Sequence, residues 1–416
     1  MNSLKILYTS VGLVLVMLAS ATGTGWDDAR SIAMAGSYTA VARGYDAIAF
    51  NPANLGLPDK PGTQLQLFAF GSTLNNNSFS MSDYEEYNGA YLSESDKRKI
   101  LSKIPSEGLE FRGNSAASAL AFTYGPLAVS TTVEAAGTGT LSKDVVDLAF
   151  FGNKIGETVS IDNADAEGLA HGDLNLAYGR RIKSYDWGDI AAGVNLKYIY
   201  GIACIDVSES SGSATTEIDG INADGSILVR SATGGSGFGF DIGVAATYRE
   251  DWVFSAGLKN LASSISWDKD AKETEYTFEA ISLTAESASE DSTVVSDEVE
   301  RSVGSFSTSL APQVNLGGTY TIGKFLLASD LKFGLKDKAG VSTTPEISVG
   351  SEFHQFSFMP LRAGVSFGGV HGTSLGLGGG FRLSSFYIDL AWASSGTLLP
   401  SFGRGLSLAI SSGLRF

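Results

Sequence analysis

Residues 405–416, with the sequence GLSLAISSGLRF, decide the fold class because they alternate in character along their whole length. Large apolar side chains occupy every second position, with Ser412 as the one exception, and small or polar side chains occupy the positions between. Side chains at every second position share one face of a β-strand. The stretch therefore predicts a strand with one face against an apolar phase.

The same alternation recurs upstream at 190–200, 238–248, 361–367 and 386–392. Each run is about ten residues long, which matches a tilted strand that crosses a membrane and exceeds the usual strand of a soluble protein. Aromatic residues also recur toward the strand ends, as the girdles of a membrane barrel require. These aromatic residues are Tyr178, Tyr198, Tyr248, Trp252 and Trp392.

A soluble β-sandwich also has an apolar inner face, so alternation alone leaves that fold open. Run length, aromatic positions and the small or charged opposite face together favour an all-β fold, a transmembrane antiparallel β-barrel. Counting the segments predicts about 14 strands, with about 16 as the alternative. We expect tight turns at one end of the barrel and long polar loops at the other.

The amino terminus predicts a signal peptide at 1–21. Lys5 provides a positive start, residues 6–18 form an apolar stretch too short for a stable membrane helix, and 19–21 give a small-x-small cleavage pattern. An uncleaved membrane anchor is the alternative. After cleavage of the signal peptide, the chain is predicted to lie in the bacterial outer membrane. The last residue, Phe416, resembles the terminal aromatic signal by which the barrel assembly machinery recognises outer-membrane barrels.

Composition excludes several classes of function. The net charge of -16 argues against a nucleic-acid partner, since phosphate binding needs clustered Lys and Arg. Cys204 is the single cysteine, so no internal disulfide is expected. The sequence has no HExxH, P-loop or paired cysteines, and its three histidines lie far apart. We therefore expect no enzyme, no catalytic residues, no cofactor and no metal site.

Two long connections predict short helices. Residues 79–113 contain SESDKRKILSKI, in which Ser93 and Asp96 form a capping box, and 141–156 contain a second helical pattern. Residues 268–300 are densely acidic. A solvated loop or extended hairpin is the favoured interpretation of this run, and a cation site is the alternative.

Residues 22–61 precede the first convincing strand and are too apolar for a solvated tail. A barrel of about 14 strands encloses a lumen wider than its own side chains fill, so we expect this segment to fold into the lumen as a hatch. Asn51 is predicted to cap a short helix that begins at Pro52, and Asp46 and Arg43 to pair with luminal charges. A simple turn at Asn51-Pro52 is the alternative.

The segment resembles the amino-terminal region of the outer-membrane transporter superfamily of FadL and OmpP1 type, including the PorV-like barrels of type IX secretion. Residues 256–261, AGLKNL, resemble a strand motif of the PorV-like branch, and 360–369, PLRAGVSFGG, resemble an uncharacterised subgroup from Bacteroidetes and relatives. Ala35 departs from the usual glycine of the pattern. The matching positions are Ala33, Met34, Ala35 and Gly36, then Ala40 to Ala42, Asp46 and Ala47, and finally Asn51, Pro52, Ala53, Asn54 and Leu55.

The resemblance implies a barrel at 62–416, a hatch whose motif includes Met34, Gly36, Asp46, Asn51, Pro52 and Ala53, and passive transport of a small hydrophobic, fatty-acid-like molecule. The alternative function is a PorV-like barrel that transports nothing and binds secreted or surface proteins through its outer loops. An open water-filled porin is third. The expected partners are outer-membrane lipid, a hydrophobic small molecule, the barrel assembly machinery and a possible surface protein.

Overall fold

The computed structural model describes residues 28–58, 62–152, 154–160, 165–284, 294–338 and 340–416. The predicted signal peptide at 1–21 lies outside these ranges, as do 22–27 and 59–61 at the two ends of the predicted hatch. No helix within the described ranges is long and apolar enough to cross a membrane.

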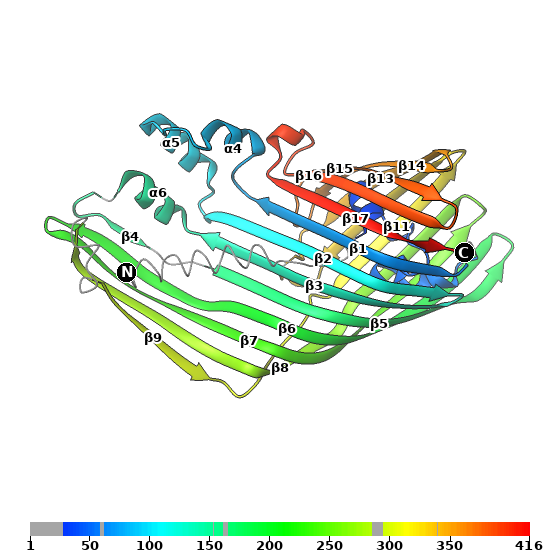
Figure 1. The fold of residues 1–416 in the computed structure, drawn as a ribbon, viewed down its shortest axis with the longest axis horizontal. Helices are drawn as coiled ribbons and strands as arrows, with labels where there is room; N and C mark the ends of the chain where they lie inside the picture. The colour runs from blue at the N-terminus through cyan, green and yellow to red at the C-terminus, as the bar shows by residue number, and fades with distance from the viewer. Residues whose placement is uncertain (1–27, 59–61, 153, 161–164, 285–293, 339) are drawn as a thin grey trace.

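The fold is a closed ring of 14 hydrogen-bonded antiparallel strands (Figure 1). The ring closes because β1 pairs with β2 on one side and with β17 on the other. The prediction of about 14 strands is confirmed, and the alternative of 16 is wrong. The ring strands are β1 (Gln64–Asn76), β2 (Leu109–Tyr124), β3 (Leu127–Leu141), β5 (Asp165–Tyr185), β6 (Gly188–Glu217), β7 (Gly220–Tyr248), β8 (Trp252–Leu283), β11 (Gln313–Ile322), β12 (Phe325–Gly334), β13 (Glu346–Phe356), β14 (Met359–Gly368), β15 (Ser374–Leu383), β16 (Phe386–Ser395) and β17 (Gly405–Arg415). Three short strands, β4 (Thr158–Ser160), β9 (Val294–Ser302) and β10 (Phe306–Thr308), join the same sheet.

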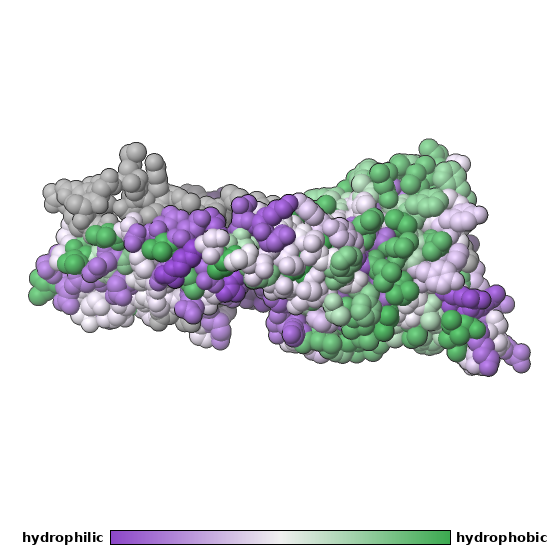
Figure 2. Space-filling model, turned by 90° about the horizontal axis from the view of Figure 1, so that it is seen from below, coloured by the Kyte–Doolittle hydropathy of each residue, from purple (hydrophilic) through white to green (hydrophobic). Residues whose placement is uncertain are grey.

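Each ring strand has an apolar outer face and a small or polar inner face, as the alternation predicts. On β17, Leu408 is exposed while Ser407 and Ser411 are buried. The turns between β5 and β6, β7 and β8, and β11 and β12 are short, and aromatic side chains stack there. Trp252 stacks on Tyr320 with ring centroids 4.4 Å apart. We call this the tight-turn end, and hydrophobic residues cover much of the adjoining ring on the face that Figure 2 shows.

The opposite, long-loop end carries the helices. Both predicted inserts form: α5 (Glu94–Lys103) begins at the Ser93–Asp96 capping box, and α6 (Lys143–Phe151) follows β3. The other elements there are α4 (Met81–Tyr87) and η3 (Pro400–Phe402).

Three strands are far longer than the ten-residue runs of the sequence, since β6, β7 and β8 have 30, 29 and 32 residues. Beyond the ring they form a sheet extension, residues 201–237 and 262–283 with β9, which projects from the long-loop end and is polar in Figure 2. Its polar surface explains why no long apolar run marks these residues. The acidic run lies in paired β8 and β9, which agrees with an extended hairpin; residues 285–293 of the run are outside the described ranges.

Strand pairing in the wall is interrupted between β1 and β2. Leu65 pairs with Phe122 and Phe68 pairs with Ala119, but the two residues between on each strand do not pair. Each strand also carries a one-residue irregularity on its other side, against β17 and β3 respectively. Bulges of this kind bend a strand and interrupt pairing. We call this place the wall gap, formed by Gln66, Leu67, Leu120 and Ala121.

Residues 28–57 lie inside the ring, where they contact strands on opposite sides of it. We call them the N-terminal segment; it contains α2 (Ala29–Ala33), α3 (Asp46–Phe50) and η1 (Pro52–Gly56). The wall presents glycines to it, because a methyl group at these positions would overlap the segment. These collar glycines are Gly179, Gly193, Gly243, Gly317, Gly350, Gly364, Gly376 and Gly378.

Valine in place of Gly243 is expected to expel the N-terminal segment, because its Cβ would overlap the side chain of Asn51. The ring should still form, and limited proteolysis of the purified protein should cleave within residues 28–57 roughly ten-fold faster, given the usual cost of overpacking. Gly318→Val is the control, since its nearest neighbour is a Phe254 ring carbon at 3.5 Å. Equal cleavage in the two variants would contradict the close packing.

Candidate functional site

The N-terminal segment is built from short helices with side-chain caps. The carboxylate of Asp28 accepts hydrogen bonds from the backbone amides of Arg30 and Ser31, at 2.7 and 3.1 Å, and so begins α2. After α2 the chain turns through Ala35 and Gly36, whose φ angles are 50° and 86°. This left-handed region suits Gly36 and strains Ala35, at the position where the resembling family carries glycine.

Asn51 fastens the segment to the wall. Its Oδ1 accepts a hydrogen bond from the amide of Ala53 at 3.0 Å, and Pro52 begins η1, so the predicted cap is confirmed as local geometry. Its Nδ2 donates to the carbonyls of Val244 and Ala256, at 3.0 and 3.3 Å. These carbonyls belong to β7 and β8. One buried amide side chain therefore caps a helix and bridges two wall strands.

Two further buried polar residues hold the backbone of the segment. Asp330 of β12 accepts hydrogen bonds from the amides of Tyr38 and Thr39, at 3.0 and 2.8 Å. Asn54 donates to the carbonyls of Thr39 and Ala42 and accepts from the hydroxyl of Ser255 on β8 at 2.7 Å. Buried backbone groups need such partners. The contacts fix the loop between α2 and α3 to β8 and β12.

An ion-pair network connects α2 to the opposite part of the wall. The guanidinium of Arg30 donates to both oxygens of Glu352 on β13, at 3.2 and 3.1 Å. Glu352 also pairs with Arg362 of β14, which reaches Asp389 of β16 at 2.6 Å. Arg382 of β15 completes the network through Asp389 at 2.9 Å. Four adjacent strands thus share charges with one arginine of the segment.

The predicted motif residues do come together inside the ring. Met34, Gly36, Asp46, Asn51, Pro52 and Ala53 all lie in the buried segment. Asp46 accepts a hydrogen bond from the hydroxyl of Tyr38 at 3.0 Å, and Arg43 donates to carbonyls of residues 40–42. The pairing of these two residues with luminal charges stays a prediction. Sequence reasoning missed Arg30, Asp330 and Glu352. The only feature of the sequence that could have pointed to these three residues is a charged side chain on the inner face of a strand or beside the hatch motif.

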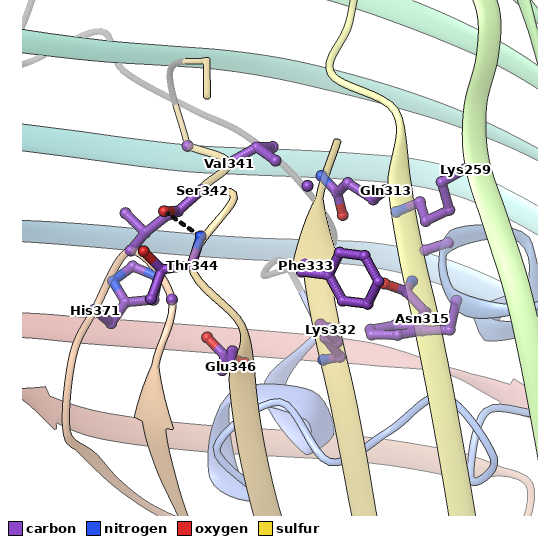
Figure 3. A pocket seen from close by; sticks show the side chains of 16 residues that line it. Lys259, Gln313, Asn315, Lys332, Phe333, Val341, Ser342, Thr344, Glu346 and His371 are labelled. Carbon is purple, nitrogen blue, oxygen red and sulfur yellow. Dashed lines mark hydrogen bonds between the residues drawn. The ribbon is translucent and has the colours of Figure 1, made fainter. Parts of the chain in front are cut away.

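Two small polar cavities remain in the lumen on either side of Ala49, Phe50 and Lys259, which line both. The first, of about 70 Å³, lies between α3 and the loops of the long-loop end (Figure 3). The second, of about 50 Å³, lies beside Asp46 and behind the wall gap, where Gln66 and Ala121 line it. Each has room for only a few water molecules.

Comparison with known sequences identifies the family. The model of a family of unknown function, DUF5723, matches residues 52–234 and 217–390. The chain belongs to DUF5723. No curated protein sequence matches this DUF5723 member. Within the described residues, no group of three His, Cys, Asp or Glu side chains is placed to hold a metal ion.

Solved structures show which fold this DUF5723 chain shares. The toluene transporter TodX of Pseudomonas putida is 13% identical over 95% of this chain and 99% of its own, with a TM-score of 0.56. The toluene transporter TbuX of Ralstonia pickettii is 14% identical over 93% and 98%, with a TM-score of 0.53. A FadL homologue of Pseudomonas aeruginosa is 12% identical over 94% and 98%, also with a TM-score of 0.53. The fold is that of the FadL-type outer-membrane barrels, as the sequence resemblance implies.

Asn51→Ala is expected to weaken the hold on the N-terminal segment by about 1–3 kcal/mol, because three hydrogen bonds of a buried amide are lost. Hydrogen exchange measured by mass spectrometry should show this as faster exchange of peptides from 29–57, with strand peptides unchanged. The control variant Asn88→Ala, at the exposed end of α4, should leave the exchange of both the 29–57 peptides and the strand peptides unchanged. Unaltered protection in Asn51→Ala would show that packing alone retains the segment.

Packing of the segment is expected to depend on pH through Asp46, which lies in α3 and not in a wall strand. Burial, reinforced by the nearby Asp28 carboxylate, raises the pKa of Asp46 to about 7. The packed state therefore holds a proton that the released segment gives up near its ordinary value of 3.8. The stability of packing is full below that value and is lost as the pH rises toward 7.

Protection factors for 29–57 should thus be roughly ten-fold or more lower at pH 8 than at pH 5. Asp46→Asn should reduce this difference. Burial also raises the pKa of Asp28, so some dependence should persist. An equal pH response in the variant would assign the effect to other groups.

Proposed function

We propose that this barrel admits a small hydrophobic molecule from outside the cell, past the N-terminal segment acting as a hatch, and releases it sideways into the membrane. The observation that carries the proposal is the wall gap beside α3. Ala121, at the gap, packs in one apolar cluster with Tyr45, Ala47 and Ile48 of the segment. A molecule that displaces α3 would meet the one described stretch between β1 and β2 where strand pairing is already interrupted.

The fold supports the same proposal. Two of the structures of similar fold are toluene transporters, and a hydrophobic molecule can leave a barrel into lipid without crossing water. In this orientation the tight-turn end faces the periplasm and the helices and sheet extension lie outside the cell. Phe416 then ends β17 at the periplasmic side, where its role as an insertion signal stays a prediction. The alternative of a barrel that only binds protein partners gains no support from these comparisons.

The lateral route can be tested by locking the wall gap. Gln66 and Ala121 lie opposite each other without pairing and both face the lumen. In a Gln66→Cys/Ala121→Cys variant, with Cys204→Ser to remove the native thiol, oxidation should reduce uptake of radiolabelled toluene and oleate at least roughly ten-fold, by analogy with other lost gating motions. A reductant should restore uptake. The host is a bacterium that lacks its own FadL-type transporter.

A disulfide at Thr73 and Asn114 is the matched control, because these inward residues pair normally on the same two strands. Uptake should survive that crosslink. Equal uptake with the gap locked would contradict a lateral exit here, and no uptake of either probe above the empty host would contradict the proposed transport.

A further inference from the structure

The first luminal cavity contains two buried charges of opposite sign that the protein leaves without a partner. Lys259 of β8 is 9% exposed and Glu346, the first residue of β13, is 8% exposed. Both line the cavity, on different sides of it in Figure 3. In the part of the chain that the structure describes, neither side chain makes a hydrogen bond or an ion pair, and they do not pair with each other.

Opposite charges act on both groups only from beyond ion-pair distance: Lys332, the register partner of Glu346, and Asp241, which acts on Lys259. Lys332, the other cation of the cavity, already donates to the carbonyl of Gly36 in the N-terminal segment. The Oδ1 atom of Asn315, in the same lining, is buried and has no hydrogen-bond partner. Burying a charge is costly unless it is paired. Three converging polar groups without partners, two of them charged, are the pattern of a binding site rather than of a packed core.

The rest of the lining is mixed. Its apolar side chains are Phe50 of the segment and Val341 and Val370 of the adjoining loops, and its polar side chains include Gln313, Ser342, Thr344 and His371. The cavity thus offers one cationic and one anionic group without a direct partner, with apolar side chains beside them. Its volume of about 70 Å³ corresponds to roughly five water molecules, which suits a molecule of amino-acid size that projects toward the loops.

We propose that this cavity binds a small zwitterion with an apolar side group, its carboxylate on Lys259 and its ammonium group on Glu346. The amide of Asn315 accepts a further hydrogen bond from the ammonium group. The apolar side group packs against Phe50 and Val341. The site is reached from the long-loop end while the N-terminal segment stays in place, so it is independent of the passage proposed above.

Isothermal titration calorimetry of the purified barrel in detergent tests the proposal with three matched probes. L-valine carries both charges, 3-methylbutanoate lacks the ammonium group, and 2-methylpropylamine lacks the carboxylate. L-valine should bind saturably, and each analogue should bind roughly 10- to 100-fold more weakly, the usual effect of losing a charged hydrogen bond.

Substitutions test which residue binds the carboxylate of the zwitterion and which binds its ammonium group. Lys259→Met should lower the affinity for L-valine to that of 2-methylpropylamine and leave the affinity for the amine unchanged. Glu346→Gln should lower the affinity for L-valine to that of 3-methylbutanoate and leave the affinity for the acid unchanged. Lys336→Met, an exposed lysine at the same end, should change nothing. Faster electrophoretic migration of unheated samples confirms that each variant is a folded barrel.

Three results would overturn the site. Equal affinity for 3-methylbutanoate and L-valine would show a site for anions only. Equal affinity for 2-methylpropylamine and L-valine would show a site for cations only. No saturable heat with any of the three probes would show that the cavity holds only water. Because binding is measured without transport, loss of toluene and oleate uptake with L-valine binding intact would count against the passage alone.

Discussion

Close approach of two backbones is the constraint on which the rest of this structure depends. A ring of this size encloses more space than its own side chains fill, and here the backbone of residues 28–57 fills it. That is possible only where the wall presents almost no side chain, as at Gly193, Gly243 and Gly364. Part of the high glycine content therefore reflects packing across the lumen and not only the number of turns.

Shape places the segment, and buried polar groups then hold it in one position. The carboxylate of Asp330 and the amide of Asn51 satisfy backbone groups that would otherwise lack water. The Arg30–Glu352 pair adds a charge contact with β13. Buried ion pairs contribute little net stability because desolvation offsets their attraction. Their arrangement here specifies where the segment sits, while the glycine collar supplies most of the contact.

The sequence predicts the barrel well because lipid imposes a simple alternation that 405–416 and 238–248 show plainly. It also predicts the Asn51 cap, since capping depends on neighbouring residues. It does not predict the length of β6 to β8, because strands in water need no apolar face toward lipid. Nor does it predict the Arg30–Glu352 contact, whose partners are 322 positions apart, or the wall gap, which depends on pairing between strands.

The contacts are distributed unevenly over the segment, and this bears on how it could move. α2 is tied to the wall by Arg30, and η1 by Asn51 and Asn54. α3 lies between them, and within the described residues it makes no hydrogen bond to the wall. Its side chains also separate the two luminal cavities and cover the wall gap. Displacement of α3 alone would therefore join both cavities to the gap while the polar contacts of α2 and η1 stay in place.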